Sequence, residues 1–133
     1  MMKRRDSNRD AMQLPTEAEL EILNILWTLG PSTVRDVHTA SAKDTGYTTI
    51  LKQMQVMAEK GLLSRSEQYR SHVYEARIAK EQTQRQLTRS LMQRAFDGSA
   101  KNLVLGALSS QKVSAKDLAE IRRMLDEYER GSR

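Results

Sequence analysis

The chain has 133 residues, which is enough for one compact domain or for a small domain with an additional helical region. It contains no cysteine and only two histidines, His38 and His72, far apart in sequence, so we expect no disulfide framework, no thiolate metal site and no histidine-rich metal site. A formal net charge of +5 and a sequence pI of about 9.7 suit a polyanionic partner without identifying one.

The start of the chain carries no targeting or membrane signal. Met1–Arg5 is basic but has no apolar stretch behind it, so it does not read as a secretory signal. No run of about 18 apolar residues follows, and we therefore expect no membrane insertion. Residues 1–13 are polar and are predicted to be a disordered tail. A cytoplasmic protein is the default expectation.

A first helix is predicted to begin at Thr16. Thr16 and Glu19 have the spacing of a capping box, and Pro15 blocks a helix from entering from upstream. Gly30 and Pro31 end the helix. Its apolar stripe consists of Leu20, Leu23, Ile25, Leu26 and Trp27.

Two further helices are predicted before the pattern changes. The second begins at Ser32 or Thr33, and the third begins at Thr48 and stops at Gly61. Apolar residues recur in the third helix at helical spacing, at Ile50, Met54, Met57 and Ala58. The opposite face carries Thr48, Thr49, Lys52, Gln53 and Gln55. A short helix of this kind is typical of the element that enters the DNA major groove in a helix-turn-helix protein.

After Gly61 the alternation predicts two antiparallel strands, with Glu67–Ser71 as a polar turn and a basic tip. Helix and hairpin together predict a winged helix-turn-helix DNA-binding domain over residues 14–78. Hydroxyls of Thr48 and Thr49 suit phosphates, Lys52 suits guanine and Gln53 suits adenine. The hairpin residues Arg65, Arg70 and His72 are candidates for holding phosphates beside the minor groove. The alternative is that these side chains form an ordinary solvated surface.

From Ala79 to Arg130 the chain is predicted to be helical, in three amphipathic segments. Isolated helices of this length are marginal in water, and little chain remains for them to pack against, so we expect a second copy to cover their apolar faces. The predicted dimer-interface residues are Leu103, Val104, Ala107, Leu108, Leu118, Ile121, Leu125 and Tyr128. The fold class is thus mainly α: a winged helix with a small hairpin, plus a C-terminal three-helix dimerisation region.

No constellation of catalytic residues is found. There is no nucleophile–base pair, no glycine loop for phosphates and no zinc-protease signature, so we expect neither an enzyme nor a cofactor or metal. Two other functions stay open beside a DNA-binding repressor. One is a small-molecule-sensing winged-helix regulator, and the other is a winged-helix protein-interaction module.

Three pieces of the chain resemble the penicillinase-repressor family of the BlaI/MecI type. They are Leu14–Leu23 with Leu26 and Trp27, Tyr47–Ile50, and Glu59–Leu63 with Tyr74. The resemblance implies a homodimeric repressor that binds an inverted-repeat operator. It implies recognition-helix contacts by Tyr47, Thr48, Thr49 and Lys52, and wing contacts by Arg70 and His72.

The resemblance also implies a route of release. In the family, a membrane-bound sensor metallopeptidase often drives cleavage in the dimerisation region, which maps here to Leu103–Leu108. The sequence departs from the family in two places: Gly106 and Ala107 stand where the best-known cleavage bond joins asparagine to phenylalanine, and Val56 stands where many relatives carry arginine. Because the chain lacks cysteine, it does not share the mechanism of the copper-responsive relatives.

Overall fold

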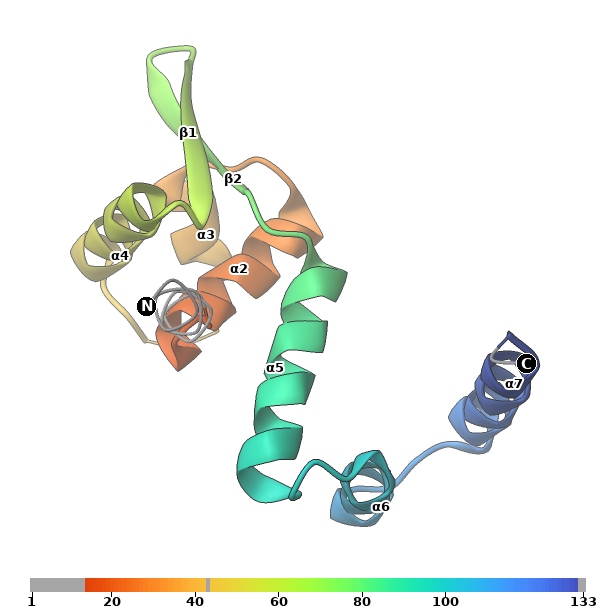
Figure 1. Cartoon of the computed structure of the whole chain (residues 1–133). Helices are drawn as coiled ribbons and strands as arrows, with labels where there is room; N and C mark the ends of the chain where they lie inside the picture. The colour runs from red at the N-terminus through yellow and green to blue at the C-terminus, as the bar shows by residue number, and fades with distance from the viewer. Residues whose placement is uncertain (1–13, 43, 132–133) are drawn as a thin grey trace. The chain divides into compact units, whose positions relative to one another are not determined.

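The computed structural model describes residues 14–42 and 44–131; the predicted tail, residues 1–13, lies outside this range. The chain divides into two compact units, one ending at Thr88 and one beginning at Arg89, and each is described by itself. Within the described residues there are six helices and one two-stranded sheet (Figure 1), which confirms the mainly α winged-helix fold. The elements are α2 (Glu17–Leu29), α3 (Val34–Ala40), α4 (Tyr47–Lys60), β1 (Leu63–Gln68), β2 (Ser71–Ala76), α5 (Lys80–Ala95), α6 (Ala100–Ser110) and α7 (Ala115–Gly131).

Helix α2 begins with the predicted capping box. The Thr16 hydroxyl accepts the Glu19 backbone N–H at 3.1 Å, and Glu19 Oε1 accepts the Thr16 N–H at 3.0 Å. These contacts satisfy two of the amide donors that a helix start leaves free. The helix ends at Gly30, whose φ of 83° and ψ of −165° fall in a region that essentially only glycine adopts.

Helix α3 has a second capping box, which sequence reading did not identify. The Thr33 hydroxyl accepts the Asp36 N–H, and the Asp36 carboxylate accepts the Thr33 N–H. The helix therefore begins at Val34, directly after Thr33, one of the two predicted starts. Both Arg35 and Asp36 are exposed in the first turn, but the Asp36 carboxylate is engaged at the cap.

A single apolar core joins α2, α3, α4 and the base of the hairpin. Leu23, Val37, Met54, Met57 and Tyr74 have no exposed side-chain surface. The remaining core residues are Ile22, Leu26, Val34, Ile50, Leu62 and Leu63. Trp27 packs against this core, and its Nε1–H donates to the Ile78 carbonyl at 2.9 Å. Helix α4 is thus fixed along its whole apolar side.

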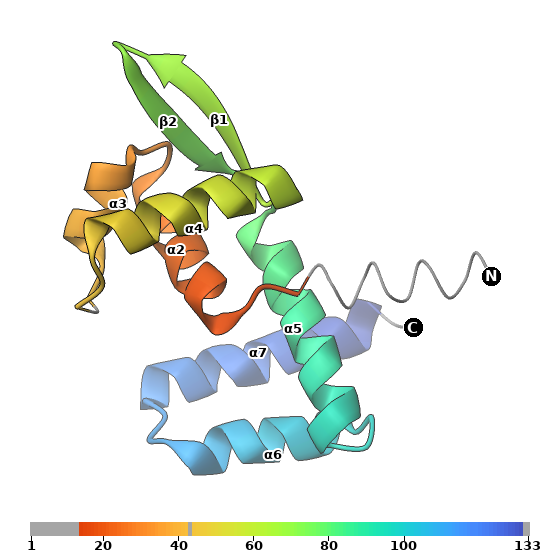
Figure 2. The same ribbon diagram turned by 90° about the vertical axis from the view of Figure 1, so that its left-hand side faces the viewer.

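Strands β1 and β2 pair antiparallel, with Leu63 opposite Ala76 and Gln68 opposite Ser71. The predicted turn was too long: Glu67, Gln68 and Ser71 are strand residues, and only Tyr69 and Arg70 make the turn. A further bridge ties the hairpin to the end of α2, because Ser32 and Tyr74 exchange backbone hydrogen bonds at 2.9 and 2.8 Å. Both Figure 1 and Figure 2 show the hairpin standing out from α2, α3 and α4.

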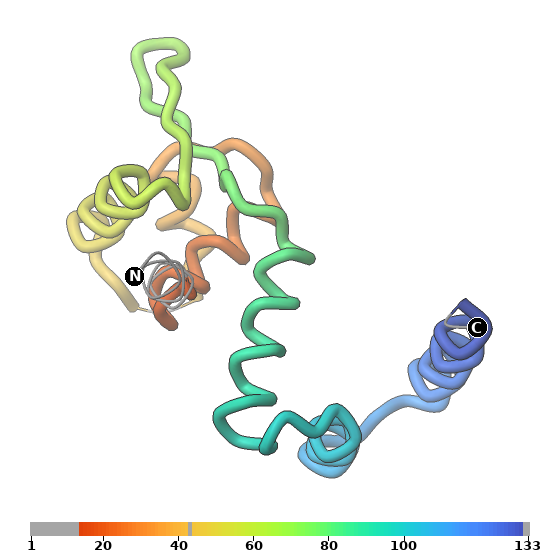
Figure 3. Tube along the Cα trace, in the orientation of Figure 1, coloured from red at the N-terminus to blue at the C-terminus, as the bar shows by residue number. Residues whose placement is uncertain are grey.

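The second unit contains the end of α5 followed by α6 and α7, whose path Figure 3 traces. Asp97 and Gly98 turn the chain with positive φ, and the Ser99 hydroxyl caps α6. Gly106 lets the Phe96 ring come close, since a Cβ there would lie 3.2 Å from the ring. No described residue of α6 or α7 is buried. No helix in the described ranges combines the length and apolar character needed to cross a membrane.

Candidate nucleic-acid interface

Helix α4 presents a polar face to solvent, as its spacing predicted. Thr48, Thr49 and Lys52 are exposed, and Gln53 is half-buried. The other side of the helix is held in the core by Ile50, Met54 and Met57. Because the buried side fixes the rotation of the helix, the exposed residues point away from the folded unit in a defined order.

The N-terminus of α4 differs from those of α2, α3 and α6. Its N-cap is Gly46, and no side chain caps it, whereas α2 and α3 each have a complete capping box. The amide groups of the first turn therefore have no side-chain acceptor at the cap. The exposed hydroxyls of Thr48 and Thr49 lie on the same turn, and a helix start with such groups favours anionic oxygen atoms.

Tyr47 is held by a ring contact with α3. Its ring meets the His38 ring edge-on, with the centroids 5.9 Å apart and an interplanar angle of 81°. His38 Nε2–H donates in turn to the Thr45 carbonyl at 3.1 Å. His38 thus supports the start of α4. Tyr47 remains 43% exposed, so its outer edge is accessible to a partner.

A surface hollow between α3, α4 and β2 brings predicted residues from separate elements together. Tyr47 and His72 both line it, although 25 positions separate them in the chain. Arg35 lines the same hollow and is exposed, and no partner is recorded for it among the described residues. The sequence does not indicate a role for Arg35, because nothing local to α3 shows that its first turn faces the hairpin. The complete lining is Thr33, Val34, Arg35, Tyr47, Leu51, Ser71, His72 and Tyr74.

The other wing residues lie in different places. Arg65 lines a second hollow with Arg77, beside the end of α4, and Arg77 was not among the predicted residues. Arg70 sits in the turn itself. His72 is paired across the hairpin with Glu67, an acidic residue that reduces the local positive charge. The cations of the hairpin therefore stand at its tip and near its base, with Glu67 and Glu75 on the strands between and beside them.

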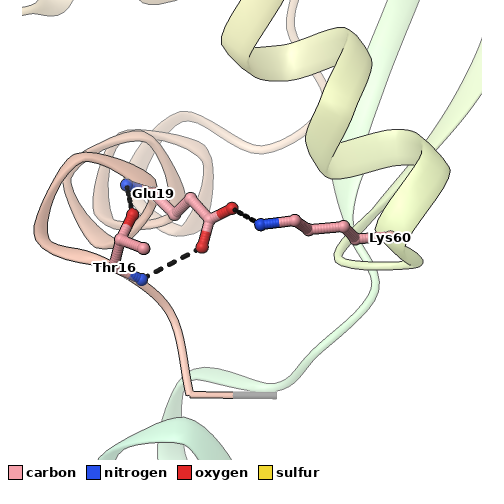
Figure 4. Close-up of polar contacts among 3 residues, drawn as sticks. All are labelled: Thr16, Glu19 and Lys60. Carbon is pink, nitrogen blue, oxygen red and sulfur yellow. Dashed lines mark hydrogen bonds and ion pairs between the residues drawn. The ribbon is translucent and has the colours of Figure 1, made fainter. Parts of the chain in front are cut away.

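An ion pair fixes the far end of α4. Lys60 Nζ lies 2.8 Å from Glu19 Oε2, and the same carboxylate accepts the Thr16 N–H (Figure 4). Burial alone would raise the pKa of Glu19, but the hydrogen bonds from Lys60 and Thr16 and the charge of Lys60 outweigh it, so this pKa is lowered. Glu19 is only 4% exposed, and its contacts with Lys60 and Thr16 favour the carboxylate form. The pair joins the end of α4 to the start of α2 across 41 positions.

The net positive charge does not come from the winged-helix part. Residues 14–88 contain nine lysines and arginines and nine aspartates and glutamates. Residues 1–13 contain four basic and two acidic residues, and residues 89–133 contain nine and six. Any attraction of the winged helix for a polyanion must therefore depend on where its individual cations stand.

The predicted dimer residues lie on α6 and α7. Val104, Leu108, Leu125 and Tyr128 are exposed, with Tyr128 at 78%, and Ala107 is exposed as well. Leu103, Leu118 and Ile121 are half-buried. Gly106 and Ala107, the predicted cleavage region, are inside α6. No metal-binding cluster of histidine and carboxylate side chains occurs in the part of the chain that the structure describes.

Comparison with known proteins gives three findings. A family model described as penicillinase repressor matches residues 15–127. A penicillinase repressor from Bacillus licheniformis is 23% identical over 115 residues, covering 85% of this chain and 90% of that protein. Among solved structures, a MarR family protein from Bacillus stearothermophilus aligns with a TM-score of 0.49 at 15% identity, over 98% of this chain and 84% of that one.

Proposed function

The chain belongs to the penicillinase repressor family, and on that premise we propose that it is a homodimeric repressor binding an inverted-repeat operator in duplex DNA. Members of the family are DNA-binding regulators and not enzymes, so the chain is a transcriptional regulator. The observation that carries the finer proposal is the exposed polar face of α4, held rigidly by the core beside a projecting hairpin.

In this proposal α4 enters the major groove. Lys52 stands on the exposed face, has no recorded ion-pair partner among the described residues, and can donate to the O6 and N7 acceptors of guanine. Thr48 and Thr49, beside the uncapped helix start, contact phosphates and fix the depth of the helix. Gln53 is half-buried whereas Lys52 is exposed, so Gln53 contributes less to base recognition than Lys52.

The hollow between α3, α4 and β2 supports a path for the DNA backbone. With α4 in the major groove and the hairpin at the adjacent minor groove, a sugar-phosphate strand must cross the surface between these elements. Arg35, Tyr47 and His72 line that surface and can all donate to phosphate oxygens. Arg35 is accordingly proposed as a backbone-positioning residue.

The exposed apolar side chains of α6 and α7 support a dimer. Leu105, Leu108, Met124, Leu125 and Tyr128 would remain in water in a monomer. A second copy of the chain presents the same apolar surface, so the two copies can cover each other in a two-fold interface. Such a dimer places its two recognition helices at half-sites roughly 34 Å apart. Loss of the dimer would release DNA because each half then binds without the other half's effective concentration.

Release by cleavage in α6, by a membrane sensor metallopeptidase, is proposed as the regulatory step. Gly106 and Ala107 stand within a helix, whose backbone groups are hydrogen-bonded, so the segment must open locally before a protease can bind it. The protease preference must also differ from that for an asparagine–phenylalanine bond.

Selection of bound duplexes from a random pool by the full chain tests the proposed function. The proposal expects enrichment of one sequence with two-fold symmetry, at physiological ionic strength. Enrichment of a sequence only when a small molecule is added or removed would favour the small-molecule-sensing regulator instead. Failure to enrich any sequence would favour the protein-interaction module and overturn the proposal.

A further inference from the structure

The tip of the hairpin has a backbone that its residues do not favour. Tyr69 and Arg70 form the two-residue turn with φ of 51° and 64°. Two-residue hairpin turns with positive φ at both positions strongly prefer pairs such as Asn-Gly, because other residues place their Cβ against the backbone there. The hairpin therefore keeps a tyrosine and an arginine at the two positions where smaller residues would fold better.

Folding does not compensate for this strain. Tyr69 is 98% exposed, so its aromatic ring gains no burial from the folded unit. Arg70 is exposed too, and no ion pair is recorded for it within the described ranges. Figures 1 and 2 show the turn at the end of the hairpin farthest from α2, α3 and α4. Strain at an exposed position of this kind is typical of a site kept for contact with a partner.

We propose that Tyr69 and Arg70 form a probe that enters the DNA minor groove and favours A·T base pairs there. This inference rests on the proposed function, which places α4 in the major groove and brings the hairpin to the groove beside it. The minor groove is only about 6 Å wide, and a hairpin tip closed by two residues is a narrow element to insert.

The chemistry of the two side chains selects the base pair. Arginine is attracted to the enhanced negative potential of narrow, A·T-rich minor grooves. The Arg70 guanidinium and the Tyr69 hydroxyl can donate to adenine N3 or thymine O2, whereas the guanine 2-amino group presents a further donor that the guanidinium, which has no acceptor, cannot meet. The probe therefore reads positions that α4 does not reach, and it favours A·T over G·C at the outer flank of each half-site.

The first test is the double variant Tyr69→Asn/Arg70→Gly in the full chain. This exchange relieves both unfavourable φ angles, so Tm should rise by a few degrees. Affinity for the selected operator should fall by about tenfold. The opposite directions exclude misfolding as the reason for weaker binding. A variant that gains stability and binds the operator with unchanged affinity would overturn the inference.

The second test locates the contact in the minor groove. Flanking A·T pairs are replaced by inosine·cytosine, which lacks the 2-amino group, or by guanine·cytosine, which carries it. The wild-type chain should tolerate inosine and lose about tenfold with guanine, and the double variant should lose little with either. Equal losses for both replacements would place the readout in the major groove and reject the probe.

The variant Tyr69→Phe is the matched control, because it keeps the ring and removes only the hydroxyl. It should lose part of the affinity and keep the A·T preference, which the Arg70 guanidinium carries. Unchanged affinity would reject the hydroxyl contact, and loss of the preference would contradict its assignment to Arg70. Failure of the inference can be told from failure of the proposed function. In the first case the wild-type chain binds a selected operator and its flank preference is absent or unaffected by the tip, and in the second no operator is selected at all.

Discussion

Lys60 joins the end of α4 to the start of α2 through a single ion pair. Its ammonium meets a carboxylate that is almost fully buried at the start of α2. Replacement Lys60→Met keeps the aliphatic stem and removes the charge, which leaves Glu19 buried with only the Thr16 hydrogen bonds. Because Lys60 is half-exposed and partly screened by water, we expect a loss of about 1–2 kcal/mol of unfolding free energy at neutral pH. Urea unfolding measures it.

The same pair gives the fold a dependence on pH. The pKa of Glu19 is lower in the folded chain than its ordinary value, so its contribution to stability is present above that ordinary value and disappears as pH falls through the lowered value. The difference between wild type and Lys60→Met should therefore shrink in acid. Lys52→Met, at an exposed lysine of the same helix, serves as the control and should change stability little. A difference that stays constant down to acid pH would contradict the pair's role.

In the proposed complex, Lys52 is the α4 side chain that contacts a base edge. Lys52→Ala should weaken operator binding by about 1–3 kcal/mol, since a base contact is lost, and should weaken random-sequence binding less. Gel-shift titrations of both duplexes give the comparison. Equal weakening on the two duplexes would show that Lys52 contacts phosphate and not a base edge.

Arg35 should behave in the opposite way. If it holds a phosphate in the hollow beside Tyr47, Arg35→Ala weakens operator and random DNA alike and lowers the slope of log affinity against log salt by about 0.9 per protomer. Arg85→Ala provides the control, because Arg85 is an exposed arginine on α5, away from the hollow. An unchanged slope for Arg35→Ala would remove Arg35 from the interface.

Sequence patterns predicted part of the candidate site at this scale. Helical spacing placed Thr48 and Lys52 opposite the buried Met54, and the structure has them exposed. Helical spacing could not identify Arg35, because this residue joins the candidate site only when β2 lies beside α3. Nor could it identify the pairing of Lys60 with Glu19, because the two residues are distant in the chain. Local patterns carry no information on which distant elements meet.

At the scale of elements, the helices of the winged-helix part were predictable because their starts and stops are encoded locally. Thr16 with Glu19 begins α2, and Gly61, in the left-handed region, ends α4. The hairpin was predicted too, but the predicted turn was longer than the observed two-residue turn. Tyr69 and Arg70 do not resemble the residues that two-residue turns favour. The Ser32–Tyr74 bridge depends on tertiary structure and left no sequence signal.

Gly30 connects α2 to that bridge, and its conformation can be tested. Gly30→Ala should destabilise the chain by about 1–3 kcal/mol, because alanine does not adopt this combination of φ and ψ without strain. Gly61→Asn is the control: its left-handed conformation tolerates asparagine, so its loss should stay below about 1 kcal/mol. Denaturant unfolding compares the two, and equal losses would contradict the assignment.

At the scale of the molecule, the distribution of charge separates two contributions to DNA binding. The winged-helix stretch is balanced in formal charge, while the positive surplus lies before residue 14 and after residue 88. Long-range attraction of a polyanion therefore belongs to the whole chain, and in the proposed complex the choice of sequence depends on a few cations of the winged helix. The pI of the whole chain does not show that its positive surplus lies outside the winged-helix stretch.

A substitution on α7 tests whether its exposed apolar side chains form the proposed dimer interface. Leu125 is 60% exposed, so Leu125→Asp should leave the folded chain intact but weaken association by at least about tenfold, because a charge would be buried twice in a two-fold interface. Ala119→Asp adds the same charge at an exposed position on another face of α7 and should have little effect. Sedimentation velocity measures both. A Leu125→Asp chain that sediments as a dimer would contradict the proposed interface.

The most direct test is methylation protection of guanine N7, which lies in the major groove, by the full chain on its selected operator. The account predicts two protected patches, related by two-fold symmetry and about one helical turn apart, and their loss with Lys52→Ala. Protection of a single patch, or of no guanine N7 at all while the DNA is bound, would contradict the presentation of two α4 helices to the major groove.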